Sequence, residues 1–180
     1  MRKVILYIAM SLDGYIADQN GKVDWLNAYN DVEEGTDSYS LLLETVDTVV
    51  MGYNTYHQIV TELSPEQWIY EELKSYVITH NKIPSNPEIM FVNNSPSDLV
   101  KKLKKESGKD IWICGGANII SQLMQEELID RFHISVIPTI LGNGIRLFED
   151  SHNEMKLDLV QTKNGSGIVE LIYEHRSNGR

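Results

Sequence analysis

The chain has 180 residues, of which 42% are hydrophobic and 23% are charged, and these values fit one domain, residues 1–180, built around one core. A formal net charge of -10 disfavours nucleic-acid binding, because it would repel a phosphate backbone. No apolar run reaches the roughly 18 to 20 residues of a membrane span, and the single cysteine, Cys114, cannot form an internal disulfide, so we expect a cytoplasmic protein.

Short apolar segments with the length and composition of buried strands recur along the first two thirds of the chain, at residues 4–10, 46–51, 75–79, 89–92 and 111–114. Stretches typical of helices separate them, at residues 32–44, 55–60, 66–73, 97–106 and 118–126. Because parallel neighbouring strands need crossover connections, this alternation predicts an α/β fold with a mainly parallel sheet and helices on both faces.

The last third of the chain has a different pattern. Strands are predicted at residues 131–137, 157–163 and 168–175, with no long helix between them. The Asn-Gly-Ser-Gly sequence at residues 164–167 is typical of a hairpin turn, because asparagine and glycine tolerate positive φ. We therefore expect an antiparallel hairpin at the C-terminal end of the sheet.

The loop after the first strand, SLDGYIAD at residues 11–18, is rich in glycine and carboxylates, and Asn20, Gly21 and Trp25 follow it. In an open α/β sheet, ligands bind outside the carboxyl ends of the strands, so this loop is a candidate site. The alternative is an ordinary surface connection in which Asn20 and Gly21 form a turn and Trp25 anchors the core.

Two glycine turns follow buried strands. Gly52 leads from the second strand into a helix with Asn54 or Thr55 as its cap, and Gly115 and Gly116 lead from the fifth strand into another helix. Free backbone N–H groups and the positive end of the helix dipole suit a phosphate at such positions. Each turn alone fits a routine capped turn, but the pair suits the two phosphate regions of a dinucleotide. The absence of a GxGxxG fingerprint disfavours a Rossmann dehydrogenase.

A polar segment follows the third predicted strand and consists of Thr79, His80, Asn81 and Lys82. These side chains could hold the extra phosphate that distinguishes NADP from NAD, or they could form an ordinary polar loop. The five histidines show neither HExxH nor paired Cys/His spacing, so we expect no metal site. A GxSxG elbow and a Walker lysine loop are also absent, which disfavours hydrolases and kinases.

The order of these motifs, from SLDGYIAD through VVMGYNTY at residues 49–56 and THNK at 79–82 to ICGGAN at 113–118, resembles the dihydrofolate-reductase-like superfamily. The later segment PTILGNG, at residues 138–144, is similar to the reductase domain of the bifunctional riboflavin-biosynthesis deaminase/reductase. The resemblance implies a dihydrofolate-reductase-like three-layer sandwich, NADPH as cofactor, and a homodimer. It further implies hydride transfer to a small heterocyclic, pyrimidine- or pteridine-like substrate, as in 5-amino-6-(5-phosphoribosylamino)uracil reductase.

The same resemblance implies that NADPH lies across the carboxyl edge of the sheet. The residues that it implies for the cofactor are Ala9, Met10, Gly14, Tyr15, Ile16, Gly52, Tyr53, Asn54, Thr55, Thr79, His80, Lys82, Gly115, Gly116, Ala117 and Asn118. Asp13, Trp25 and Asp37 are implied to face the substrate, and the Gly115–Gly116 peptide bond is implied to be cis.

Two positions depart from the family pattern. Tyr53 stands where dihydrofolate reductase typically carries an arginine after the Met-Gly pair, so His80 or Lys82 would have to contact the 2′-phosphate. Tyr15 stands where the riboflavin reductase typically carries a lysine, and this removes a cation suited to a phosphorylated substrate.

Hydride transfer also needs a proton donor, and a partly desolvated carboxyl group can hold its proton near neutral pH. Asp13 is the first candidate for this catalytic role and Asp37 the second, although Asp37 could be only a helix cap. Dihydrofolate reduction, a nucleotide-binding protein without turnover and a structural partner protein are the alternative functions.

Overall fold

The computed structural model describes residues 1–29, 38–149 and 154–176. The strands are β1 (Val4–Ser11), β2 (Tyr15–Ala17), β3 (Val46–Gly52), β4 (Lys74–Ile78), β5 (Ile89–Val92), β6 (Asp110–Gly115), β7 (Arg131–Ile137), β8 (Ile145–Arg146), β9 (Leu157–Gly165) and β10 (Ile168–His175). The helices are α1 (Ser38–Thr45), α2 (Tyr53–Gln58), α3 (Pro96–Leu103) and α4 (Ala117–Gln125), with the 3₁₀-helix η1 (Asp24–Tyr29) and the short π-helix η2 (Ile59–Leu63).

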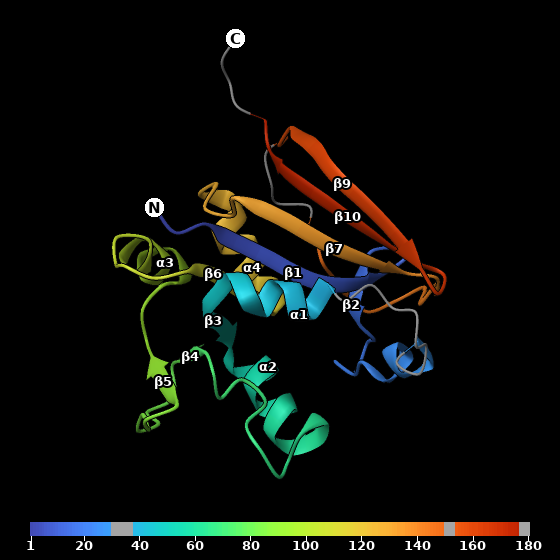
Figure 1. Ribbon diagram of the computed structural model, residues 1–180. Coiled ribbons are helices and arrows are strands. Elements are labelled where there is room, and N and C mark those ends of the chain that lie inside the picture. The colour runs from blue at the N-terminus through green and yellow to red at the C-terminus, as the bar shows by residue number, and fades with distance from the viewer. Residues whose placement is uncertain (30–37, 150–153, 177–180) are drawn as a thin grey trace.

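Eight strands form the central sheet in the order β5-β4-β3-β6-β1-β7-β10-β9 (Figure 1). The pairings from β5 to β7 are parallel, whereas β10 pairs antiparallel with both β7 and β9. This arrangement confirms the predicted mainly parallel sheet with an antiparallel C-terminal hairpin. In the hairpin turn, Ser166 and Gly167 adopt positive φ values of 56° and 81°.

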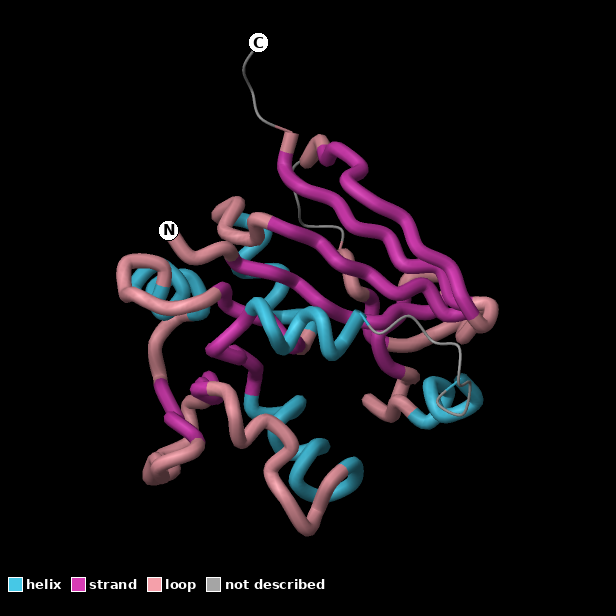
Figure 2. The backbone as a smooth tube through the Cα atoms, viewed as in Figure 1, coloured by secondary structure: helices cyan, strands magenta, loops and turns pink. Residues whose placement is uncertain are grey.

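Side chains of successive strand residues point to opposite faces, and this alternation builds two cores. On one face Val4 and Leu6 of β1 pack with buried side chains of α3 and α4. On the other face Ile5 packs with Leu42 of α1, and we call this side the α1 face. Helices therefore flank the sheet on both sides, giving three layers (Figure 2). None of the helices within the described ranges is long and apolar enough to cross a bilayer.

The helix predicted at residues 66–73 is wrong, because this segment forms turns. Trp68, Tyr70 and Leu73 are buried there, so the apolar residues that suggested a helical face instead anchor an irregular connection. The two-stranded ribbon of β2 and β8 was not predicted from the sequence, because each strand has only two or three residues. The predicted helix at residues 32–44 corresponds to α1, and residues 32–37 lie outside the described part.

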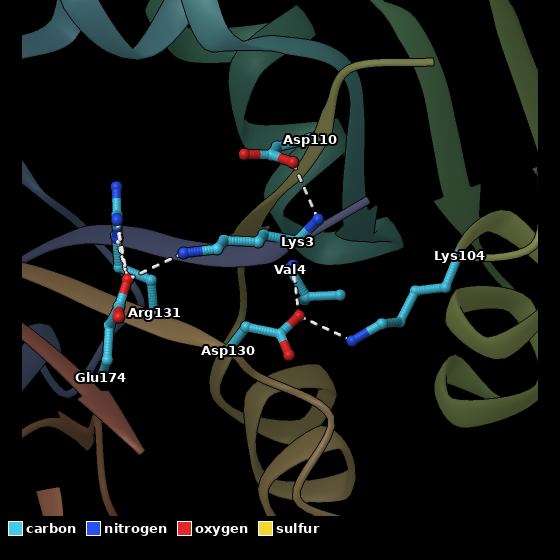
Figure 3. Close-up of polar contacts among 7 residues, drawn as sticks. All are labelled: Lys3, Val4, Lys104, Asp110, Asp130, Arg131 and Glu174. Atoms are coloured by element: carbon cyan, nitrogen blue, oxygen red, sulfur yellow. Dashed lines mark hydrogen bonds and ion pairs between the residues drawn. The ribbon is translucent and has the colours of Figure 1, made fainter. Parts of the chain in front are cut away.

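Ion pairs hold the amino-terminal edge of the sheet (Figure 3). The Glu174 carboxylate accepts from Lys3 at 3.0 Å and from Arg131 at 2.7 Å, which joins β10 to β7 and to the start of β1. The Asp130 carboxylate accepts from the Val4 backbone N–H at 2.7 Å and from Lys104 Nζ at 2.6 Å. These contacts support the fold at the edge opposite to the predicted ligand site.

Candidate active site

The carboxyl ends of the parallel strands bring the predicted cofactor segments to one edge of the sheet. β3 ends at Gly52 and its neighbour β6 ends at Gly115, and the register places Met51 opposite Gly115. β4, on the other side of β3, leads into Thr79 and His80. The three segments therefore lie in the order that the sheet topology dictates, side by side.

The two glycine turns are in contact. A methyl group on Gly52 would lie 3.9 Å from the Gly116 backbone nitrogen and 3.3 Å from Ile119 of α4. A methyl group on Gly116 would lie 3.5 Å from Thr55 Oγ1, and one on Gly115 would lie 3.9 Å from the same oxygen. The hydroxyl of Thr55 thus lies beside the second turn, so the N-terminal ends of α2 and α4 lie next to each other.

Neither of these two helix starts has a side-chain cap. Gly52 is the N-cap of α2 and Gly116 is the N-cap of α4, and a glycine offers no side chain to accept from the first backbone N–H groups. The expectation that Asn54 or Thr55 caps its helix is therefore wrong, because α2 already begins at Tyr53. By contrast, α3 is capped by Ser95, which accepts from the Asp98 N–H at 3.1 Å.

The second turn has the backbone geometry expected from the sequence. The peptide bond between Gly115 and Gly116 is cis, as predicted, and Gly115 has a φ of 132°. Only glycine adopts such a φ without steric cost. Ala117 and Asn118 follow as the first residues of α4, with Ala117 buried and Asn118 exposed.

The segment after β4 is held against β5. The Thr79 N–H donates to the Val92 carbonyl at 2.9 Å, and the buried Thr79 hydroxyl accepts from the Asn81 N–H at 3.0 Å. His80 is exposed and its Nδ1 lies 2.7 Å from Asn93 Oδ1. Lys82 is also exposed and brings a positive charge to this part of the edge.

Tyr53 does not reach toward this segment. Its ring packs within α2, with centroids 6.0 Å from Tyr56 and 5.8 Å from His57. The side chain that replaces the family arginine is thus part of an aromatic cluster.

Asp13 anchors the loop after β1. Its carboxylate accepts from the Ser11 hydroxyl at 2.6 Å and from the backbone N–H groups of Leu141 and Gly142 at 3.1 and 2.7 Å. The Ser11 hydrogen bond, followed by those from Gly142 and Leu141, lowers the pKa of Asp13 to about 2. A proton donor needs a raised pKa, so we correct the acid role expected for Asp13: the ionised carboxylate joins two loops.

The other residues expected near the nicotinamide surround this loop. Ala9 lies in β1 opposite Ser135 of β7, while Met10 and Ile16 pack against the core of the α3 and α4 face. Tyr15 is buried, and the Arg146 guanidinium lies over its ring, 5.1 Å from the centroid. Gly14 has a φ of 88° and open space where a side chain would stand.

Trp25 lies in η1 and has a buried indole N–H without a hydrogen-bond partner among the described residues. A buried unpaired donor is costly, so this N–H suits a polar group of a ligand. Asp37, the second candidate acid, lies outside the described residues.

A buried polar cluster on the α1 face was not found from the sequence. Glu170 Oε2 accepts from the Ser38 hydroxyl at 2.5 Å and lies 3.2 Å from His133 Nε2, and Lys163 Nζ donates to Ser38 Oγ at 3.0 Å. Burial lowers the pKa of His133 against the opposing effect of Glu170, so the imidazole is neutral at pH 7. A charged residue at an inward strand position, as at Glu170, is the signal that could have revealed the cluster.

No group of three or more His, Cys, Asp or Glu side chains within the described ranges could hold a metal ion.

Comparison with known proteins agrees with this geometry. The profile of the RibD C-terminal domain family matches residues 2–169. The uncharacterized protein YwjB of Bacillus subtilis (strain 168) is 41% identical over 175 residues, covering 96% of this chain and 97% of that protein.

Two solved structures share the fold. A Shewanella sp. PV-4 protein named for riboflavin biosynthesis is 28% identical, with a TM-score of 0.83 over 97% of this chain and 99% of its own. The Thermotoga maritima diaminohydroxyphosphoribosylaminopyrimidine deaminase/5-amino-6-(5-phosphoribosylamino)uracil reductase is 16% identical, with a TM-score of 0.69 over 97% of this chain and 57% of its own. The predicted dihydrofolate-reductase-like three-layer fold is thereby confirmed, and the chain belongs to the RibD C-terminal domain family.

Proposed function

We propose that the protein is an NADPH-dependent reductase that transfers a hydride to a small pyrimidine- or pteridine-like substrate. The observation that carries the proposal is the contact between the two uncapped helix starts at Gly52 and Gly116. Both helices begin at the carboxyl edge of the sheet, and the first N–H groups of such helices suit the linked phosphates of a dinucleotide.

The remaining residues of this edge fit the other parts of the cofactor. His80 and Lys82 are exposed beside the Gly52 turn and supply hydrogen bonding and positive charge for a 2′-phosphate. A flat ring would lie next to Ala9 of β1 and Gly14, where nothing stands within 4 Å of a methyl group added to Gly14. When bound, the nicotinamide supplies the hydride, and the protein binds and orients it.

The substrate would lie on the α1 face, next to Trp25. The unpaired indole N–H of Trp25 can donate to a ring oxygen or nitrogen. The Thermotoga maritima protein of the same fold is named as a 5-amino-6-(5-phosphoribosylamino)uracil reductase, and this supports a heterocyclic substrate. The Tyr15 replacement favours a substrate whose recognition does not depend on a cation in the loop after β1.

The proposal is tested by titrating the purified protein with NADPH and, in parallel, with NADH while the emission of Trp25, Trp68 and Trp112 is followed. Saturable binding with NADPH clearly tighter than NADH supports a cofactor site at the two turns. A protein that binds neither nucleotide contradicts the reductase function and leaves a shared fold with another role.

Two further functions are distinguished by turnover. NADPH oxidation with dihydrofolate but not with 5-amino-6-(5-phosphoribosylamino)uracil would favour dihydrofolate reduction. NADPH binding without oxidation by either compound would favour a nucleotide-binding protein without catalysis.

We further propose a homodimer in the cytoplasm, and a monodisperse monomer in small-angle scattering at working concentration would contradict the dimer.

A further inference from the structure

A reductase of this kind needs a proton source as well as a hydride. Hydride addition to a C=N or C=O carbon leaves an electron pair on the heteroatom, and this pair must be protonated. Asp13 is ionised at neutral pH and all its described bonds are to the loops that it joins. A proton donor is therefore needed elsewhere, and the α1 face next to Ala9 is the nearest surface to the expected nicotinamide.

Tyr7 and Ser11 are the hydroxyl-bearing residues of β1 on this face, each two residues from Ala9. The Ser11 hydroxyl already donates to Asp13, which leaves Tyr7. It stands two residues before Ala9, so both side chains point to the same side of the sheet. Its ring packs edge-on against His133, with centroids 4.7 Å apart, and lies 6.3 Å from Tyr39 of α1. Among the described residues no hydrogen bond engages the Tyr7 hydroxyl, and the side chain is only partly buried. The phenol is thus available to a ligand.

The surroundings of Tyr7 keep it protonated. Burial raises the pKa of Tyr7 to about 12, and the Glu170 carboxylate and the Tyr39 phenol add to this effect. Glu170 itself is fixed by Ser38 and His133, as described above. Because an ionised carboxylate only accepts, the neutral imidazole carries its proton on Nε2 and donates it to Glu170.

The strand register connects this cluster to the place expected for the nicotinamide. Four residues are successive partners across β1, β7, β10 and β9: Ala9, Ser135, Glu170 and Lys163. Tyr7 and His133 form the next row on the same face. A substrate that stacks on a ring near Ala9 and extends over the first row therefore lies beside the second row, to which Tyr7 belongs.

We propose that Tyr7 donates the proton in the reduction and that His133 and Glu170 are positioning residues that hold its ring. The inference rests on the proposed function. The hydride brings two electrons to the electrophilic carbon, the π pair of the double bond moves to the heteroatom, and that atom takes the phenolic proton of Tyr7. Water then returns a proton to the phenolate, so the enzyme is regenerated.

The first test compares Tyr7→Phe with wild type, using NADPH oxidation with 5-amino-6-(5-phosphoribosylamino)uracil and with dihydrofolate. The variant keeps the aromatic ring and removes only the donor. We expect kcat to fall by about 100-fold, the lower range for the loss of a general acid, with unchanged NADPH affinity and thermal stability. The control is Tyr76→Phe, the same change on a partly buried residue of β4 that packs on the opposite face, and its kcat should stay within about twofold of wild type.

The outcomes separate the two proposals. A Tyr7→Phe protein with kcat within twofold of wild type overturns the donor role and leaves the reductase function intact. A parallel loss of NADPH affinity and stability would assign Tyr7 a packing role and would also overturn it. A wild-type protein that binds NADPH but reduces neither compound contradicts the reductase function, and the donor role falls with it.

The positioning role has a readout that does not depend on turnover. In an NMR titration of the His133 ring, Glu170→Gln should lower the pKa of His133 further, because the carboxylate opposes the effect of burial in the wild type. An unchanged His133 titration would contradict the contact on which the arrangement depends. Asp158→Asn, which removes an exposed carboxylate of β9 paired with Arg176, is the control and should leave the His133 titration unchanged.

Discussion

The α-carbon of Gly144 lies so close to Ala17 that a methyl group on it would stand 2.1 Å from the Ala17 carbonyl oxygen. Gly144 also has a φ of 151°, which only glycine adopts readily. The close approach joins the loop before β8 to the end of β2. It explains why the LGNG segment needs its second glycine.

Gly144→Ala should therefore destabilise the protein by about 2 kcal/mol or more, because the backbone would have to move to admit the methyl group. Gly21→Ala is the matched control: Gly21 has a φ of 79° but nothing within 4 Å of the added methyl, so only the conformational cost of about 1 kcal/mol applies. Chemical denaturation measures both, and equal effects would contradict the steric explanation.

The pH dependence of stability should report the Asp13 link. The folded pKa of Asp13 is about 2 and lies below its ordinary value of 3.8, so the link stabilises the fold above pH 4 and is lost as the pH falls toward 2. The difference in melting temperature between wild type and Asp13→Asn should be constant from pH 7 to about pH 5 and shrink below pH 4. A difference that grows on acidification would contradict the hydrogen bonds to Leu141 and Gly142.

Gly52→Ala should weaken NADPH binding more than it weakens the fold. The added methyl would meet Ile119 at 3.3 Å, and this local crowding should cost the fold about 1 kcal/mol. The same methyl would stand between the two turns that are proposed to hold phosphates. We expect a loss of NADPH affinity of about tenfold or more by fluorescence titration.

Gly52→Ala in an Ile119→Ala background separates the two effects. Ile119→Ala removes the γ-carbon that the added methyl would meet at 3.3 Å, so Gly52→Ala should cost little further stability in this background, but it should still weaken NADPH binding. Unchanged NADPH affinity in this background would show that crowding alone caused the loss.

Lys82→Ala should reduce affinity for NADPH by about threefold to fivefold and leave NADH unchanged, because one exposed cation contributes up to about 1 kcal/mol toward a phosphate. The difference should diminish at high salt, where exposed charges are screened. Lys105→Ala, at an exposed position following α3, is the control. An equal loss for both nucleotides would place Lys82 away from the 2′-phosphate.

The order and type of the main elements could be predicted because the buried strands are continuous apolar runs. Strands β5, β7 and β10 were predicted with the bounds that the structure has. The prediction of a helix at residues 66–73 was wrong, because the spacing of Trp68, Tyr70 and Leu73 also fits an irregular segment that buries these side chains. Burial in tertiary structure, and not local periodicity, decided that segment.

The geometry of the candidate site could be predicted only where it depends on the backbone. Glycines at strand ends located both turns, and the cis bond between Gly115 and Gly116 followed from the family resemblance. The buried cluster around Glu170 was missed, because it joins residues from α1, β7, β9 and β10 that are far apart in the chain. The three hydrogen bonds that lower the pKa of Asp13 could not be predicted either, since two of them come from backbone groups of a loop that is distant in the sequence.

The central place of β1 also has a consequence for how the protein is made. Within this domain β1 leaves the ribosome before the other strands, but its two neighbours are β6 and β7, so Ile5 pairs with Trp112 and Arg131. An apolar strand must therefore remain without its partners while most of the chain is synthesised, and such exposed strands favour aggregation. β1 gains its second neighbour only when β7 has emerged, so the edge proposed to bind the cofactor forms late in synthesis.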